Sequence, residues 1–362
     1  MGLKGRGRFW RNVALPRDQP SPISLTAPQG GGPGEVLSDY RGYDLRQEWE
    51  GRERTTRLEQ ELLADLAKDL DRQRWLELGC GYGRVTPVLA SASREFVALD
   101  LNDEALVSVP VPKGPEHFLR VAANLHHLPF EQDSFTVVSL IRVLHHLEDP
   151  RSVLREILRV LVPGGSLLLS YAPKPTLGTL QQDILRWIRG TSPGRTYTTF
   201  SRRDVDFLGE LPFPIVVPRA AYVRQLVEEA GGLPAKEWGH GPEALERVLP
   251  LAASRALSRI FGTTVLASTR FLLCHKPGGP TGFPIGTPLR WSCPRCHSSL
   301  DPEPTEREGT MRCPHCAFPF RRFPGLVDAR YIPPHSRRVG PDPRGARDRD
   351  GPLPDPWGDS SP

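Results

Sequence analysis

A glycine-rich turn after a short apolar segment is the part of this sequence best suited to chemistry. The segment Trp75–Leu78 runs into Gly-Cys-Gly-Tyr-Gly at positions 79–83. Glycines at such a turn let the backbone bend sharply and approach a ligand closely. Asp100 closes the next apolar segment, 21 residues after Gly79. A carboxylate there can accept hydrogen bonds from both hydroxyls of a ribose, so the pattern predicts a site for a ribose-containing cofactor.

Two cofactors suit such a turn. A nicotinamide dinucleotide site needs G-x-G-x-x-G, whose third glycine frees a helix N-terminus for the pyrophosphate. This chain has Arg84 at that third position, and Glu77 precedes the glycines. S-adenosylmethionine (SAM) carries no phosphate, but it has an amino-acid end that an acidic residue and glycine backbone can hold. The pattern therefore favours SAM over NAD.

Strands and helices are predicted to alternate around this turn, which indicates an α/β fold with a doubly wound, mostly parallel sheet. Asp149 and Pro150 have the residue types of a helix N-cap and first helical position. The expected helices are Arg54–Leu70, Arg84–Ala92, one from Asp103, one from Pro150 to Pro163, and Pro218–Ala230. The expected strands are Trp75–Leu78, Phe96–Leu99, Phe118–Val121, Thr136–Leu140, Ser166–Tyr171 and Thr264–Cys274.

Four further motifs follow the glycine turn in order. They are Leu-Pro-Phe at 128–130, Asp-Ser-Phe at 133–135, Val-Leu-His-His-Leu at 143–147 and Leu-Arg-Val-Leu-Val-Pro-Gly-Gly at 158–165. With these motifs the chain resembles the class I SAM-dependent methyltransferases over about residues 40–275. The resemblance is strongest to the type 11 subgroup, which includes quinone-biosynthesis methyltransferases. It implies a Rossmann-like methyltransferase fold and methyl transfer from SAM.

The resemblance also implies roles for individual residues. Asp100 is expected to hold the ribose, and Arg142 to face the cofactor unless it is a surface arginine. Asn124 stands where family members often carry Asp. The residues expected at the methionine end of SAM are Glu77, Gly79, Cys80, Gly81 and Gly83. Those expected beside the adenine are Leu101, Asn124 and Leu125.

Catalysis is expected to rest mainly on alignment, because the sulfonium of SAM is already an activated methyl donor. A base is needed only where the acceptor must lose a proton. His145 and His146 follow the expected strand Thr136–Leu140, at the edge of the sheet where such folds bind ligands. One of them could act as base or position the acceptor; the alternative is a packing role at a helix start.

The methyl acceptor cannot be named from the sequence. The insertion 172–217 is the usual place for acceptor selectivity, and within 184–203 five arginines alternate with aromatic residues and no acidic residue intervenes. This composition suits RNA or another anionic acceptor, or else an arginine-rich surface. The motifs typical of amino-directed and cytosine carbon-5 nucleic-acid methyltransferases are absent from the sequence. Small molecule, RNA and protein therefore remain open as acceptor classes.

Two C-x-x-C pairs predict a metal site near the C-terminus. Cys293, Cys296, Cys313 and Cys316 place 16 residues between the pairs, which is the spacing of a tetrahedral, structural Zn²⁺ site. The following segment, 318–328, resembles the zinc-ribbon proteins that bind and activate methyltransferases. The resemblance implies an activator-like module carried in cis; the alternative is a ribbon that contacts nucleic acid directly.

Composition sets the domain boundaries. The net charge of +5 over 362 residues permits nucleic-acid binding without indicating it. No apolar run is long enough to cross a membrane and no secretory signal is evident. The C-x-x-C pairs indicate a metal site in a reducing compartment, so a cytoplasmic location is expected. The expected segments are a disordered extension 1–34, a methyltransferase domain 35–277, a linker 278–289, a zinc ribbon 290–332 with its own core, and a disordered tail 333–362.

The sequence leaves two matters open. The oligomeric state has no signature in the sequence. The competing function class is a non-catalytic SAM-binding or zinc-ribbon interaction protein, although the combination of Glu77, the turn 79–83 and Asp100 favours an enzyme.

Overall fold

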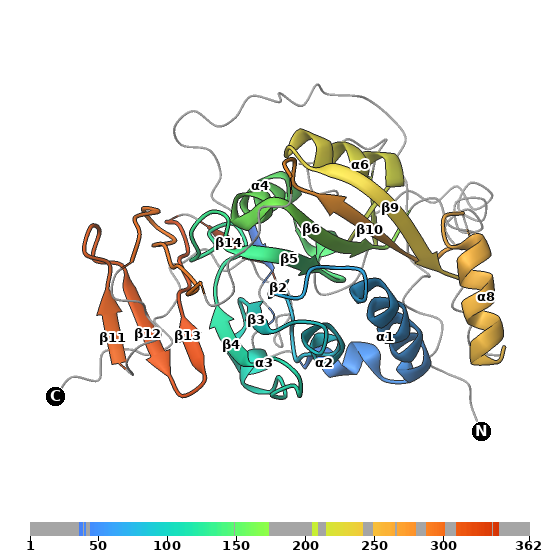
Figure 1. Cartoon of the computed structure of the whole chain (residues 1–362), viewed down its shortest axis with the longest axis horizontal. Coiled ribbons are helices and arrows are strands. Elements are labelled where there is room, and N and C mark those ends of the chain that lie inside the picture. The colour runs from blue at the N-terminus through green and yellow to red at the C-terminus, as the bar shows by residue number, and fades with distance from the viewer. Residues whose placement is uncertain are drawn as a thin grey trace.

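A ten-stranded sheet forms the centre of the protein, in the order β11-β12-β13-β4-β3-β2-β5-β6-β10-β9 (Figure 1). The computed structural model describes residues 36–38, 40, 44–147, 149–173, 205–208, 215–241, 249–264, 266–279, 287–300, 309–334 and 336–339. The expected extension 1–34 and the arginine-rich segment 184–203 lie outside the described residues.

The middle of the sheet is parallel, as the sequence predicts. Its central strands, β2 and β5, are buried along their whole length, which is characteristic of parallel sheets covered by helices on both sides. The parallel strands are β2 (Arg74–Leu78), β3 (Glu95–Asp100), β4 (His117–Ala122), β5 (Phe135–Leu140) and β6 (Leu161–Tyr171). Two antiparallel strands, β10 (Thr269–His275) and β9 (Leu233–His240), extend the sheet beyond β6.

Helices cover both faces of this sheet, which confirms the doubly wound α/β fold. Helices α4 (Pro150–Val160) and α6 (Ala220–Glu229) lie on one face. Helices α1 (Glu53–Ala67), α2 (Thr86–Ala90) and α3 (Asp103–Val107) lie on the other (Figure 1).

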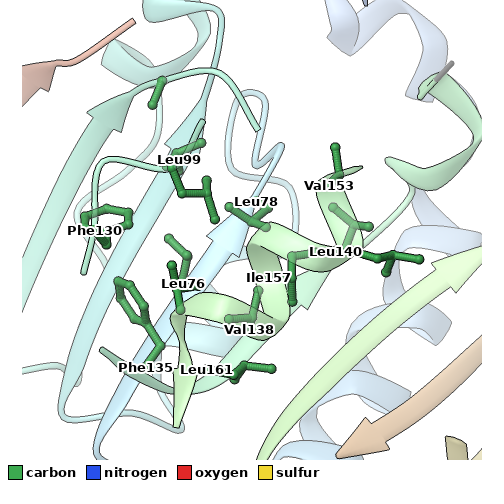
Figure 2. Packing of buried hydrophobic residues seen from close by; sticks show 14 of the residues in the cluster. Leu76, Leu78, Leu99, Phe130, Phe135, Val138, Leu140, Val153, Ile157 and Leu161 are labelled. Carbon is green, nitrogen blue, oxygen red and sulfur yellow. The ribbon is translucent and has the colours of Figure 1, made fainter. Parts of the chain in front are cut away.

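Helix α4 shows how a helix attaches to the sheet. The Asp149 carboxylate accepts hydrogen bonds from the backbone amides of Arg151 and Ser152, as the predicted N-cap requires. The apolar face of α4 packs Val153 and Ile157 against the leucines and valines of β2 and β5 (Figure 2). The amphipathic pattern of this segment therefore places the helix over the strands that carry the glycine turn.

Some elements differ from the sequence prediction. Strand β6 begins at Leu161 rather than at Ser166, because Leu161 already pairs with Phe135 before the register shifts. Strand β10 begins at Thr269 rather than Thr264. Helix α8 (Leu251–Phe261) and strand β9 are not predicted, and α8 lies beside β9 at one end of the sheet (Figure 1).

The cysteine-bearing region joins the central sheet. It contains β11 (Gly309–Arg312), β12 (Pro319–Phe323) and β13 (Leu326–Asp328), and β13 pairs in parallel with β4. Trp291 is 1% exposed, and its ring centroid lies 5.0 Å from that of Phe130. The expected separate ribbon core is thus replaced by one continuous core. The physical reason is that β4 would otherwise be an open apolar edge of the sheet.

The two ends of the described chain also meet. Strand β1 (Val36–Ser38) pairs in parallel with β14 (Arg337–Val339), so the expected disordered tail contains a strand. The remaining elements are the short helices η1 (Leu45–Trp49) and η2 (Leu144–His146) and the strand pair β7 (Val205–Leu208) and β8 (Ile215–Pro218). Among the described residues, no helix has the length and apolar character needed to cross a membrane.

Candidate functional site

The glycine turn lies at the carboxyl end of β2, with all three glycines in the left-handed region. Gly79, Gly81 and Gly83 have φ angles of 67°, 55° and 84°. Such angles favour glycine because a Cβ atom would be strained there. A side chain at Gly79 would also collide with Val143, which follows β5. The glycines therefore let the loops after β2 and β5 approach closely. Cys80 is buried between them, and burial raises the pKa of its thiol.

Asp100 connects the glycine turn to the end of β3. Its Oδ2 accepts a hydrogen bond from the Gly81 amide at 2.8 Å, and its Oδ1 accepts one from the Asn102 amide at 2.9 Å. The backbone amides of Gly79 and Cys80 both donate to the carbonyl of Leu99. Burial raises the pKa of Asp100. The carboxylate thus stands beside the turn, as the sequence predicts.

Glu77 is a buried acid beneath the turn. It is 2% exposed, and the Thr86 hydroxyl donates to its Oε2 at 2.6 Å. Burial raises the pKa of Glu77 to about 8. A carboxyl group with such a pKa is largely protonated at neutral pH, and a bound cation would favour its ionised form. Glu77 can therefore ionise when a positively charged group binds beside it.

The segment after β4 is held by the cysteine-bearing region. Asn124 is 2% exposed; its Oδ1 accepts from the His126 amide, and its Nδ2 donates to the carbonyl of Tyr331 at 3.3 Å. Leu125, in this segment, and Leu101, after β3, are both half-buried. The carboxamide of Asn124 therefore shapes the predicted adenine side by holding the backbone.

Arg142 turns toward helix α1. It has a φ of 62°, and its Nε donates to Oε1 of Glu59 at 3.0 Å. Arg84 approaches the other oxygen of Glu59 at 2.6 Å, and its guanidinium carbon lies 3.7 Å from the ring centroid of Trp49. The two arginines hold the pKa of Glu59 at about 2 against the opposing effect of burial. The guanidinium of Arg142 thus forms a buried ion pair beside the turn rather than a surface charge.

The histidine pair lies in η2, directly after β5. Tyr40 and His146 share a hydrogen bond of 2.7 Å between the hydroxyl and Nδ1. His145 Nδ1 is buried and has no hydrogen-bond partner among the residues that the structure describes. Burial lowers the pKa of His146 to about 3 and that of His145 well below its usual range. Both rings are therefore neutral at physiological pH, which suits hydrogen bonding better than the uptake of a proton.

The four predicted metal ligands come together. The sulfur atoms of Cys293, Cys296, Cys313 and Cys316 all lie within 4.8 Å of one another. The Cys293–Cys316 pair is 3.5 Å apart and the Cys296–Cys313 pair 3.7 Å apart. A tetrahedral zinc ion with thiolates at about 2.3 Å needs its sulfurs about 3.8 Å apart. The donor set and its spacing fit Zn²⁺.

The backbone of the two cysteine pairs is closely similar. His297 and Ala317 each follow the second cysteine of a pair and have φ angles of 58° and 60°. The amide of His297 donates to the carbonyl of Cys293, and that of Ala317 donates to Cys313 in the same way. Each pair therefore forms the same tight turn, which aims both of its sulfurs at one point.

Sequence reasoning missed the residues that surround the turn from distant segments. The burial of Glu59 could have been predicted, because helical spacing places it on the same face of α1 as Leu63 and Ala67, four and eight residues later. Tyr40 and Tyr331 had no such signal in the sequence, since their contacts with His146 and Asn124 span 106 and 207 residues.

In comparisons with known proteins, the region around the glycine turn matches methyltransferases. A methyltransferase domain model matches residues 76–169, which run from β2 to β6. A demethylmenaquinone methyltransferase of Renibacterium salmoninarum is 31% identical over 138 residues, covering 38% of this chain and 57% of that protein. A ubiquinone biosynthesis O-methyltransferase of Xanthomonas oryzae pv. oryzae is 36% identical over 106 residues, covering 28% and 44%. The chain spans about half the length of these relatives.

One solved structure is also similar to this chain. It is a SAM-dependent methyltransferase from Methanosarcina mazei, 19% identical, and the alignment covers 57% of this chain and 93% of that one with a TM-score of 0.42.

Proposed function

The chain carries a class I SAM-dependent methyltransferase domain, and from that premise we propose that it transfers a methyl group from SAM to an acceptor. The observation that carries the proposal is the hydrogen bond between the glycine turn and Asp100. The Gly81 amide donates to the Asp100 carboxylate where the carboxyl ends of β2 and β3 adjoin. In open α/β sheets this edge is the usual ligand site.

Each residue around the turn has a proposed role toward SAM. The Asp100 carboxylate would accept hydrogen bonds from the ribose hydroxyls. Ionised Glu77 would face the positively charged methionine end of SAM. Gly79, Cys80, Gly81 and Gly83 would line that end with backbone. Leu101, after β3, and Leu125, on the segment after β4 that Asn124 holds in place, would flank the adenine. These roles agree with the buried carboxylates and left-handed glycines of the structure.

The proposed reaction requires little acid–base catalysis by the protein. SAM, when bound, supplies a sulfonium methyl group that an aligned nucleophile can take. The protein's part is to orient the two reactants and exclude water. His145 and His146 remain the proposed side chains nearest the acceptor, and their low pKa values favour orienting it as neutral hydrogen-bonding groups.

The proposed zinc ion is structural. Four thiolates complete a tetrahedral shell and leave no position for water, so the ion would contribute to folding rather than to the reaction. The ribbon would act as a module in cis, because β13 extends the sheet that carries the glycine turn.

The acceptor is tested by following the methyl group. The zinc-loaded full chain is incubated with fractionated cell extract and SAM labelled on its methyl group. Transfer of label to the RNA, protein or small-molecule fraction would support the proposal and name the acceptor class. Tight SAM binding with no labelled product in any fraction would favour the non-catalytic SAM-binding alternative. Salt-dependent RNA binding would support a role for 184–203 in holding RNA.

A further inference from the structure

Residues near the N-terminal end of the described chain contact segments at the carboxyl edge of the sheet, beside the glycine turn. We call Tyr40 and Asp44–Trp49 the strap. No function is predicted for them from the sequence. They contact the ends of three neighbouring strands, and these strands carry the residues proposed to hold SAM.

Tyr40 links the strand ends on either side of β2. Its hydroxyl is hydrogen-bonded to Nδ1 of His146 beyond β5, and its carbonyl accepts from Nδ2 of Asn102 beyond β3 at 3.2 Å. Strand β2 lies between β3 and β5 in the sheet. Tyr40 therefore spans the mouth of the glycine turn, where β2 ends.

The rest of the strap lies along the turn itself. Leu45 is the nearest neighbour that a Cβ atom on Gly81 would meet, at 3.4 Å. The Arg46 guanidinium lies 5.2 Å from the ring centroid of Tyr82. Trp49 stacks on Arg84, directly after the turn. Three residues of the strap thus lie close to Gly81, Tyr82 and Arg84.

A neutral His146 ring is a suitable hydrogen-bond partner for the Tyr40 hydroxyl. Because burial keeps His146 neutral, its Nδ1 can accept a hydrogen bond from the Tyr40 hydroxyl when Nε2 carries the ring hydrogen. The two rings also meet edge to face, with centroids 5.4 Å apart. His146 thereby fixes the Tyr40 ring at the turn.

We propose that Tyr40 is a positioning residue for methyl transfer, whose hydroxyl bond to His146 holds the strap across the glycine turn and retains SAM there. This inference rests on the proposed function, because it requires SAM at the turn. Tyr40 acts through His146 and the strap, and no proton transfer is assigned to it.

The test measures how fast SAM leaves the protein. The zinc-loaded full chain is filled with labelled SAM, chased with excess unlabelled SAM, and compared with Tyr40→Phe, His146→Ala and the double variant. Loss of one hydrogen bond should speed release about fivefold in either single variant. The double variant should be no faster than the singles, since both remove the same bond. His146→Asn should restore slow release, because its side chain keeps an acceptor near the Nδ1 position.

A matched control separates this role from a general loss of stability. Tyr171→Phe removes a hydroxyl that donates to Glu237 at 2.6 Å, away from the strap. It should lower the unfolding midpoint and leave SAM release unchanged. Tyr40→Phe should speed SAM release and leave the unfolding midpoint unchanged. Release at the wild-type rate from Tyr40→Phe would overturn the inference and leave the proposed function standing. A wild-type chain that does not bind SAM would overturn both.

Discussion

The ribbon and the strap both contact segments at the carboxyl edge of the sheet, and they attach to the rest of the protein by different means. The ribbon joins β4 by strand pairing, with Leu326, Val327 and Asp328 in register with residues 120–122. It also buries large apolar side chains such as Trp291 in the main core. The contacts of the strap include the hydroxyl–imidazole hydrogen bond of Tyr40, its carbonyl's hydrogen bond from Asn102, and the stacking of Trp49 on Arg84.

This difference separates what builds the site from what retains a ligand in it. Backbone pairing together with a buried core breaks only on unfolding, because many contacts must be lost at once. A few side-chain contacts at a surface can break singly. We therefore expect changes in the ribbon to alter stability and SAM affinity together, and changes in the strap to alter the rate of SAM release.

Removal of zinc should have the largest effect. Structural zinc sites of this type contribute roughly 10–16 kcal/mol at neutral pH, and this ribbon shares its core with the sheet. Cys293→Ser should abolish stoichiometric zinc in elemental analysis, lower the unfolding midpoint of the whole chain, and weaken SAM binding in calorimetry. If zinc is lost while the midpoint and SAM affinity stay the same, the ribbon is an independent unit and the comparison fails.

Arg330 tests the ribbon side at a single side chain. It is 9% exposed and forms ion pairs of 2.8 Å with Asp103 and 2.7 Å with Asp328. Arg330→Ala leaves two carboxylates in a mostly buried place, which should cost about 3–5 kcal/mol in denaturant unfolding. SAM affinity should fall with stability because Asp103 begins helix α3, shortly after Asp100. Arg312→Ala, at an exposed position on β11, is the control and should change neither quantity.

Glu59 tests the ion pairs with Arg84 and Arg142, beside the strap. Its folded-state pKa of about 2 lies below the ordinary value of 4.5, so it contributes stability that is complete above pH 4.5 and is lost as pH falls toward 2. The shift corresponds to about 3 kcal/mol at neutral pH. Glu59→Gln should therefore lower the free energy of unfolding at pH 7 and flatten its dependence on acid pH. Glu53→Gln, exposed on the same helix, should retain the wild-type profile.

The sequence predicts the parallel sheet and the residues at its carboxyl edge because their signals are local. The apolar run Trp75–Leu78 enters the glycines directly, and Asp149 caps the helix that follows it. The ribbon's attachment has no such signal. The apolar pair Leu326–Val327 is visible in the sequence, but its partner strand β4 lies about 200 residues earlier, and parallel pairing at that distance leaves no periodicity.

Arg142 shows the same limit for a side chain. Its place after β5 was predictable, and so was its charge. Its direction depends on Glu59, which lies 83 residues earlier on a different helix. A residue's position in an element is thus a local property, whereas the partner of a buried charge is set by tertiary packing.

Glu77 should give a smaller effect, seen in the pH dependence of binding. Its folded-state pKa of about 8 is raised, so the free protein holds the proton at neutral pH and folding stability declines as pH rises from 4.5 to 8. If bound SAM requires the ionised carboxylate, affinity should fall as pH drops below about 8, by at most about tenfold per pH unit. Calorimetry across pH 6–9 should show this slope in the wild type and none in Glu77→Gln. A wild-type affinity that does not vary with pH would exclude Glu77 from contact with the charged end of SAM.

Binding of SAM to the zinc-loaded wild type and to Asp100→Ala, measured by calorimetry, tests the central claim most directly. Hydrogen bonds to a charged acceptor contribute roughly 1.5–3 kcal/mol each, so loss of the Asp100 carboxylate should weaken SAM binding more than tenfold. Asp100→Asn keeps an acceptor oxygen and the side chain's size, and it should fall between the two. We predict saturable binding of one SAM per wild-type chain and this order of affinities. A wild type that does not bind SAM, or an Asp100→Ala variant that binds it equally well, would contradict the account.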